Sequence, residues 1–263
     1  MRQFFRPLIV TSAATAVVLG LAGSAGASAD FDPIGHRGYT AKWTENTLPA
    51  IRAAIRHGAS AVELDVRLSR DGKMVLMHDR SVARTTNGTR YVDRLSSTRI
   101  AKLRTPDGAH VPFVNKTVRV LRRLDARPVL EIKAGAAGGW TGRQIRKLRR
   151  VLVHQRMFDR TLVISFNGDL LHRVERVTPG LATSWILRRW PTVRKIRRQG
   201  VDNVSISSGV VEPKRVRRLK RSGIGSFGRN SDRTREWKQF ERAGVVGVVT
   251  DRIPAYVRWD RSN

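Results

Sequence analysis

The 263-residue chain has no cysteine, so no disulfide bond can stabilise it and its folded state must depend on a hydrophobic core. A chain of this length can bury such a core. Long apolar runs are also missing, because no stretch beyond the first 29 residues is apolar enough to span a membrane. We therefore expect no transmembrane segment in the mature chain.

Acidic residues are scarce: 21 Asp and Glu stand against 51 Lys and Arg, which gives a formal net charge of +30. Such a surface attracts polyanions, among them anionic lipid head groups and phosphate-rich cell-wall polymers. Most of the basic residues lie at helical spacing beside apolar ones, which is typical of solvated helix faces. No motif that reads RNA or DNA is present, so we expect no dedicated nucleic-acid binding.

The first 29 residues have the pattern of a secretory signal. Arg2 and Arg6 form a positive start, an apolar stretch follows over 7–22, and small residues at 27–29 provide a cleavage site. A membrane anchor is the alternative, but polar residues and glycines interrupt the apolar stretch. We predict cleavage before Asp30, a secreted extracellular protein, and one domain over residues 30–263.

Strand and helix patterns alternate along the rest of the chain. An α/β fold follows, and we predict a TIM-type (β/α)8 barrel with its functional site at the carboxyl ends of the strands. An open doubly wound sheet is the alternative, but no Gly-rich dinucleotide-binding loop follows the first strand. The strands are expected to end near His36, Asp65, Lys133, Phe166, Leu187, Ser207, Phe227 and Asp251.

One further strand is expected over residues 73–78, as the hairpin partner of the second barrel strand. The dipeptide Asp71-Gly72 is typical of a two-residue hairpin turn. In that register Asp65 lies opposite His78, and the hairpin would bring a carboxylate beside an imidazole.

Three carboxylates are candidate metal ligands. Glu63 and Asp65 are two apart on one strand, so their side chains project to the same face, and Glu131 ends another strand. A hard divalent cation prefers several oxygen ligands. Surface salt bridges are the alternative, but the apolar flanks indicate buried strands, where unpaired carboxylates are costly.

Two histidines are candidates for proton transfer, because His36 and His78 each close a strand beside a charged residue. Arg37 offers a fork of donors to phosphate oxygens. Lys133 projects to the same face as Glu131 and can bind a second phosphate oxygen. The remaining histidines are interpreted as structural; they are His57, His110, His154 and His172.

Taken together, the chain resembles the glycerophosphodiester phosphodiesterases, in a secreted bacterial form. The matching motifs run in family order across nearly the whole mature chain. They are His36-Arg37-Gly38, Glu45-Asn46-Thr47, Glu63-Leu64-Asp65, Asp71-Gly72, His78-Asp79, Arg84-Thr85-Thr86-Asn87-Gly88, Glu131-Ile132-Lys133, Ser165-Phe166 and Thr250-Asp251.

The resemblance implies a barrel of the phospholipase C-like kind and a divalent ion, Ca²⁺ or Mg²⁺. The ion would be held by Glu63, Asp65 and Glu131. His36 and His78 would be the acid–base pair, and we assign His36 as base and His78 as acid. Arg37 and Lys133 would bind the phosphate of a glycerophosphodiester, which would be hydrolysed to an alcohol and glycerol 3-phosphate.

The chain departs from the family pattern on the late strand, where Phe227-Gly228-Arg229-Asn230 replaces Trp-Thr-x-Asn, and at Pro112–Lys116. These changes leave the substrate open. A hydrolase of teichoic acid, a polymer of glycerol phosphodiesters, and an enzyme acting on lysophospholipid are alternatives. A basic polyanion-binding protein on an inactive barrel is a third, against which the five intact histidines and carboxylates argue.

Overall fold

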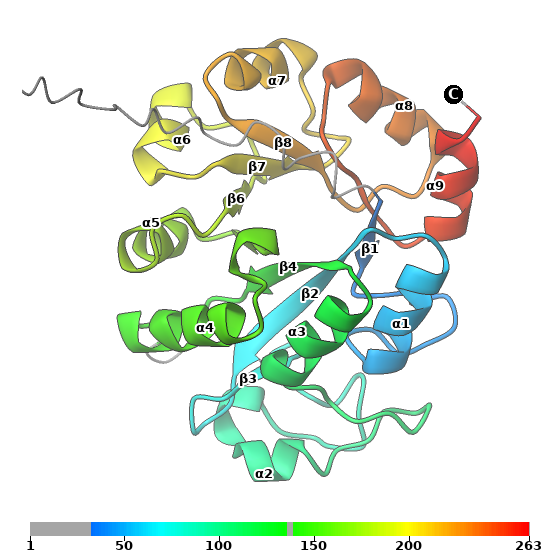
Figure 1. Ribbon diagram of the computed structural model, residues 1–263, viewed down its shortest axis with the longest axis vertical. Helices are drawn as coiled ribbons and strands as arrows, with labels where there is room; N and C mark the ends of the chain where they lie inside the picture. The colour runs from blue at the N-terminus through cyan, green and yellow to red at the C-terminus, as the bar shows by residue number, and fades with distance from the viewer. Residues whose placement is uncertain (1–32, 136–138, 263) are drawn as a thin grey trace, which may run out of the picture.

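The computed structural model describes residues 33–135 and 139–262 (Figure 1). The predicted signal peptide over residues 1–29 and its cleavage point before Asp30 lie outside the described residues. Within the described part, none of the helices combines the length and the apolar character needed to cross a bilayer.

A curved sheet forms the centre of the molecule, and helices surround it (Figure 1). The strands are β1 Ile34–His36, β2 Ala61–Leu68, β3 Met74–Leu76, β4 Arg127–Ile132, β5 Leu162–Ser165, β6 Thr183–Ile186, β7 Asn203–Ile206, β8 Gly225–Gly228 and β9 Val249–Thr250. The helices are α1 Leu48–Arg56, α2 Ser97–Ile100, α3 Val114–Arg123, α4 Gly142–His154, α5 Gly168–Val177, α6 Val193–Gln199, α7 Pro213–Lys220, α8 Thr234–Ala243 and α9 Ile253–Asp260.

The strand order β8-β7-β6-β5-β4-β2-β1-β9 is parallel throughout, and the two ends of the sheet come together. A parallel bridge joins Gly228 to Val248, and the amide of Val246 donates to Ser226 O at 2.9 Å. The result is a nearly closed eight-stranded barrel, which confirms the predicted TIM-type fold. The last strand is shorter than the pattern over 245–250 predicts, because its first residues contact β8 outside a regular ladder.

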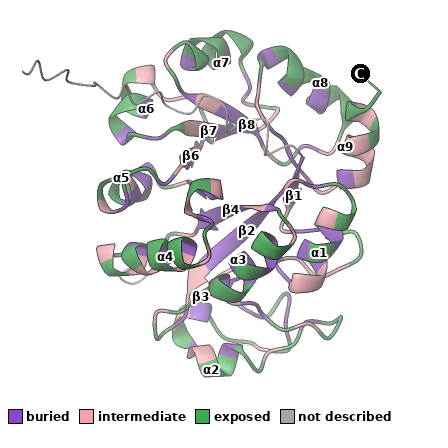
Figure 2. Cartoon of the chain, viewed as in Figure 1, coloured by how far each residue is buried: buried purple, intermediate pink, exposed green. Residues whose placement is uncertain are grey.

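The strands are buried on both faces, as Figure 2 shows for the centre of the molecule. On β2, Val62, Leu64 and Val66 belong to the large apolar cluster between the strands and the helices. Ala61 belongs to a second cluster, which the strands themselves enclose. Since successive side chains alternate, Glu63 and Asp65 share the enclosed face with Ala61. The barrel interior therefore carries carboxylates at its carboxyl end.

Local signals account for the first helix. The side chain of Thr47 accepts a hydrogen bond from the Ala50 amide, and a proline lies in the first turn. After the helix Gly58 adopts φ 98°, which suits a residue without a Cβ and ends the helix where the sequence predicts.

The hairpin after β2 forms, but its predicted register is wrong by one residue. The amide of Ser69 donates to Lys73 O, so the loop has three residues, and Gly72 takes the left-handed conformation. The amide of Met77 therefore donates to Asp65 O at 2.9 Å. His78 is not opposite Asp65, because the extra loop residue moves it one position along the strand.

The segment between β3 and α3 forms a small apolar core of its own, which lies beside the barrel at α2 (Figure 1). A bridge between Val75 and Phe113 attaches it to β3. Its buried members are Val75, Met77, Val82, Val92, Leu95, Ile100 and Val111. This core supports the stretch from His78 to Arg84, which reaches the candidate site.

Candidate active site

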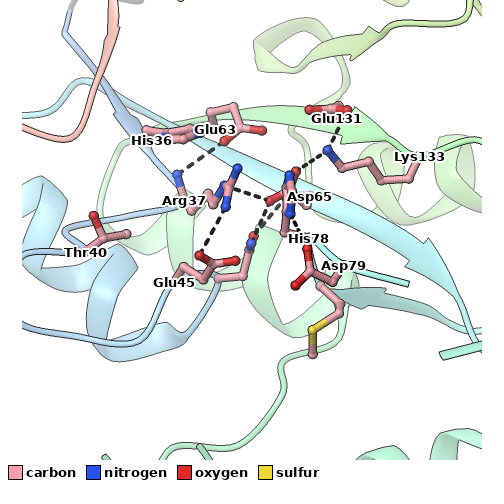
Figure 3. Close-up of polar contacts among 12 residues, drawn as sticks. His36, Arg37, Thr40, Glu45, Glu63, Asp65, His78, Asp79, Glu131 and Lys133 are labelled. Carbon is pink, nitrogen blue, oxygen red and sulfur yellow. Dashed lines mark hydrogen bonds and ion pairs between the residues drawn. The ribbon is translucent and has the colours of Figure 1, made fainter. Parts of the chain in front are cut away.

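The first strands place the predicted residues next to one another at the carboxyl end of the barrel (Figure 3). In the parallel ladders His36 pairs with Glu63, and Asp65 pairs with Glu131. A cavity of about 230 Å³ lies above them, and both predicted histidines line it. All seven predicted site residues therefore meet in one place, although they come from three strands and the three loops that follow β1, β3 and β4.

Glu63, Asp65 and Glu131 form what we call the carboxylate triad. Each offers one oxygen, these oxygens lie within 4.8 Å of one another, and all three residues are buried. Carboxylate oxygens are the ligands that Mg²⁺ and Ca²⁺ prefer. The triad thus supplies the donor set of a hard-cation site.

Two cations, Lys133 and Arg37, balance part of the triad charge, and we call them the triad cations. Lys133 Nζ lies 2.8 Å from Asp65 Oδ1 and 2.7 Å from Glu131 Oε1, and Arg37 Nε lies 3.3 Å from Asp65 Oδ2. Burial raises the pKa of Asp65, but the charges of Lys133 and Arg37 outweigh burial and lower it. Asp65 is therefore held ionised.

Asn46 fixes the orientation of Asp65. Its amide Nδ2 donates to Asp65 Oδ2 at 2.8 Å, and its Oδ1 accepts from the Asp65 backbone amide at 3.0 Å. Asn46 is itself buried and has φ 59°, a conformation that asparagine adopts more readily than most residues. The carboxylate is thus positioned by a reciprocal pair of hydrogen bonds.

Glu63 is the least compensated member of the triad. Among the described residues, the hydrogen bond to its carboxylate comes from the Arg37 backbone amide, at 3.3 Å. Burial and the nearby Asp65 charge raise the pKa of Glu63 to about 8. Such a buried carboxylate is costly without a cation. The triad therefore fits a divalent ion, which supplies the missing positive charge.

The loop after β1 is shaped by unusual backbone conformations. Arg37 has φ 55°, and its carbonyl accepts from the Asn46 amide at 2.9 Å. Gly38 has φ 96°, and a Cβ there would lie 2.7 Å from the backbone of Ala50. Only glycine fits at this position. Arg37 Nη1 then donates to Glu45 at 3.1 Å.

His36 forms a partly buried pair with Asp251, which follows β9. His36 Nδ1 lies 3.0 Å from Asp251 Oδ1, and Thr40 Oγ1 donates to the same oxygen at 3.1 Å. Burial lowers the pKa of His36, but the hydrogen bond to Asp251 and the charges of Glu63 and Asp251 outweigh it, so the pKa is raised. The pair favours an imidazolium once His36 takes up a proton.

His78 forms a second pair, with its sequence neighbour Asp79. The Nδ1–Oδ1 distance is 2.7 Å, and the other Asp79 oxygen accepts from Arg84. The bond from Arg84, followed by that of His78, lowers the pKa of Asp79 to about 2. Arg84 also donates to Glu45 at 2.7 Å, so it links this pair to the loop after β1.

In both pairs the carboxylate fixes Nδ1, so Nδ1 carries the ring proton and Nε2 remains for the substrate. The cavity beside them continues past Phe166 into a larger hollow of about 700 Å³, which His78, Glu131 and Lys133 also line. This arrangement can transfer two protons beside an anion held near a metal ion.

Several residues of the site were not assigned a role from the sequence. Asp251 and Asp79 lie in motifs of the resemblance, and Asn46 and Glu45 share another, but their contacts depend on folding. Arg188 and Arg229 also line the cavity. The change at Phe227–Asn230 was the one signal that pointed to Arg229.

Comparison with known proteins identifies the family of the chain. The family model described as Glycerophosphoryl diester phosphodiesterase family matches residues 36–255. A glycerophosphodiester phosphodiesterase of Caldanaerobacter subterraneus subsp. tengcongensis is 27% identical over 230 residues, which cover 83% of this chain and 93% of that protein. Glycerophosphodiester phosphodiesterase 1 of Bos taurus is 32% identical over 168 residues, 60% of this chain and 49% of that protein, so the match spans about half of the bovine relative.

Among solved structures, an Oleispira antarctica phosphodiesterase in complex with the product sn-glycerol-3-phosphate has a TM-score of 0.80. It is 21% identical and covers 88% of this chain and 96% of that one, and this likeness shows the shared fold. Because the family match covers most of the chain, the protein belongs to the glycerophosphoryl diester phosphodiesterase family. The prediction that it is an enzyme, a phosphoric diester hydrolase, is confirmed.

Proposed function

We propose that this protein hydrolyses glycerophosphodiesters to an alcohol and glycerol 3-phosphate, with a divalent ion on the carboxylate triad and His36 and His78 as the acid–base pair. One observation carries the proposal. Both histidines line the cavity above the triad, and each has a carboxylate on Nδ1. Two oriented imidazoles beside a hard-cation site supply the proton transfers and the charge stabilisation that speed phosphodiester hydrolysis.

The substrate phosphate would lie between the triad and its cations. Lys133 and Arg37 are already beside the triad, where their donors can reach a phosphate oxygen. The bound ion would offset the negative charge that develops on the phosphoryl oxygens. Binding in this position exposes the phosphorus atom to attack between the two imidazoles.

The different exposures of the two histidines assign one as the base and the other as the acid. Nε2 of His36 removes the proton of the attacking hydroxyl, whose oxygen forms the new bond to phosphorus, and Asp251 stabilises the resulting imidazolium. His78 enters the step as an imidazolium, and its Nε2 donates a proton to the alcohol oxygen as the bond of that oxygen to phosphorus breaks, which leaves the ring neutral with its proton on Nδ1. The side chain of His78 is 34% exposed and that of His36 is 14% exposed, so the alcohol leaves on the more open side.

The attacking hydroxyl is either water or the 2-hydroxyl of the substrate glycerol. In the second case a cyclic phosphate forms first, and water opens it to glycerol 3-phosphate. Trapping of a cyclic product in a single-turnover reaction distinguishes these two routes.

The direct test is hydrolysis of glycerophosphocholine by the metal-stripped protein, with Ca²⁺ or Mg²⁺ added back separately. We expect glycerol 3-phosphate and choline only after one of these ions is added, and the more active ion identifies the one in use. Full activity in excess EDTA, with no metal found by elemental analysis, would remove the ion from the proposal.

A polymer of glycerol phosphodiesters is a second candidate substrate. The net charge of +30 favours it, because such a surface raises the rate of encounter with a polyanion. The test compares the polymer with glycerophosphocholine at rising salt. A loss of activity confined to the polymer supports this substrate, whereas equal salt dependence argues against it.

The lysophospholipid alternative has less support. It calls for an exposed apolar rim at the cavity, but the exposed large apolar side chains of the described residues are Tyr91 and Val153, and neither lines the cavity. The inactive-barrel alternative is contradicted by the enzyme class of the family.

We also propose that the protein is exported after cleavage before Asp30. The proposal is supported by the charged, apolar and small-residue order of residues 1–29. N-terminal sequencing of the protein from the culture medium tests it: a mature chain that starts at Asp30 is expected, and an intact Met1 would contradict it.

A further inference from the structure

Two arginines that the proposed mechanism does not use lie over one aromatic ring beside the cavity. The guanidinium carbon of Arg188 is 4.5 Å from the centroid of Phe166, and that of Arg229 is 4.9 Å from it. Phe166 follows β5, Arg188 follows β6 and Arg229 follows β8. All three side chains thus come from the carboxyl ends of different strands, and all three line the cavity of the active site.

This arginine pair, Arg188 and Arg229, differs from the triad cations in its partners. Lys133 and Arg37 are bound to carboxylates, whereas within residues 33–135 and 139–262 no acidic side chain forms an ion pair with either member of the arginine pair. Nε of Arg229 is also buried without a hydrogen-bond acceptor. Two neighbouring like charges and an unused buried donor are unfavourable unless an anion joins them.

The two positive charges of the arginine pair exceed what the other charges around the cavity require. A divalent ion and the two triad cations together balance the three triad carboxylates and a singly charged phosphodiester. The positive charges of the arginine pair therefore have no counterpart in the proposed substrate complex. A second anionic group in the same substrate would supply it, and a guanidinium binds phosphate with two parallel hydrogen bonds.

The surface beyond Phe166 offers room for a longer substrate. A groove of about 350 Å³ begins at Phe166 and Arg188 and is lined further along by Trp185, Arg189 and Lys195. It leads away from the triad and is cationic on its walls. A substrate that extends past the scissile phosphate on this side would place its next phosphate at the arginine pair.

We propose that Arg188 and Arg229 form a second phosphate subsite, so that the preferred substrates are glycerophosphodiesters whose leaving alcohol itself carries a phosphate. This inference rests on the proposed glycerophosphodiester hydrolysis and names its substrate class. Two sources share the chemistry: a chain of glycerol phosphates, and a lipid head group with an additional phosphate.

The experiment compares kcat/KM for matched substrates that differ by one phosphate. The first pair is glycerophosphoglycerol and its terminally phosphorylated form, and the second is glycerophosphoinositol and glycerophosphoinositol phosphate. We expect the phosphorylated member to be preferred by about tenfold or more, the factor of one charge-assisted hydrogen bond. The pair with the larger preference identifies the source.

Variants assign that preference to the arginine pair. We expect Arg188→Gln and Arg229→Gln each to reduce the ratio of the two kcat/KM values by about tenfold. Arg119→Gln removes an equal charge from an exposed position on α3, away from the cavity, and is expected to leave the ratio unchanged. No preference in the natural protein, or an unchanged ratio in both arginine variants, would overturn the subsite.

Failure of the subsite is distinguishable from failure of the proposed function. If neither substrate of a pair is hydrolysed, glycerophosphodiester hydrolysis itself is wrong. Calorimetric binding of glycerol 1,3-bisphosphate and glycerol 3-phosphate then decides the subsite alone: tighter binding of the bisphosphate that both arginine variants abolish supports it, and equal affinity contradicts it.

Discussion

The two histidine–aspartate pairs at the mouth of the barrel share one contact, between Nδ1 and a carboxylate oxygen, but are built differently. His36 and Asp251 are 215 positions apart in the sequence and meet where the barrel closes, and His36 is mostly buried. His78 and Asp79 are sequence neighbours in a half-buried loop beside the small apolar core. The carboxylate that contacts Nδ1 thus comes from a distant residue where the barrel closes in one pair, and from the next residue in the sequence in the other.

The environments of the pairs also differ. Glu63 of the triad lies near His36, and the negative charge of Glu63 helps to raise the pKa of His36. Asp79 instead accepts a hydrogen bond from Arg84. The positive charge of Arg84 partly neutralises the carboxylate that lies beside His78. The His36–Asp251 pair therefore lies beside the carboxylate triad and the His78–Asp79 pair beside Arg84, so substitutions should affect the two pairs unequally.

Removal of either imidazole should have the largest effect. We expect His36→Ala and His78→Ala each to lower kcat by about 10²–10⁴-fold, because each removes one proton transfer. Steady-state hydrolysis of glycerophosphocholine measures the loss. His154→Ala, at an exposed position on α4, is the matched control and should be neutral. Wild-type activity in either variant would show that its imidazole does not transfer a proton.

Substitution of the aspartates should separate the pairs. We expect Asp251→Asn to lower kcat/KM by about 10–100-fold, the usual range for a group that orients a functional imidazole. Asp79→Asn should cost less than about tenfold, because the His78 side chain is 34% exposed, against 14% for His36, and water can replace part of the lost contact. With His36 as base, loss of the Asp251 charge lowers the pKa of His36, so the acidic limb of the pH–rate profile moves to lower pH. Equal losses with unmoved profiles would contradict the comparison.

The carboxylate triad should make the stability of the folded protein depend on pH and on bound divalent ion. Because the folded-state pKa of Glu63 is about 8, above its ordinary value of 4.5, the metal-free protein loses stability as pH rises between these values. A divalent ion should therefore raise Tm more at pH 8 than at pH 5. Thermal unfolding with and without the ion measures this, and Glu63→Gln should weaken the difference. A Tm gain independent of pH would be evidence against the assigned site.

The smallest effect concerns what the His36–Asp251 pair contributes to the stability of the folded protein. Because the pKa of His36 is raised above 6.5 in the folded state, its contribution is fully present below pH 6.5 and is lost as pH rises through the raised value. The Tm difference between the natural protein and Asp251→Asn should thus be greatest near pH 6, about 2–4 °C for about 1 kcal/mol. Asp79→Asn is the control, with a smaller difference expected.

Much of the fold follows from the sequence because strand and helix periods are local. The strands of the barrel end at or within three residues of the expected positions. The hairpin register was wrong because one residue more or less in a turn cannot be read from the dipeptide Asp71-Gly72. Helix α9 was not predicted, and its short apolar pattern follows directly on Thr250-Asp251.

By itself the sequence determined which side chains share a strand face and which residues are neighbours. Glu63 and Asp65 had to project together, because side chains two apart on a strand lie on the same face. Asp79 had to lie near His78 because the two are adjacent in the chain. Only the tertiary structure decided that Asp251 contacts His36. It also decided that Lys133 lies between Asp65 and Glu131. The same holds for Arg188 and Arg229, whose guanidinium groups both lie over the ring of Phe166. Those contacts depend on strand order, ladder register and barrel closure, which no local pattern specifies.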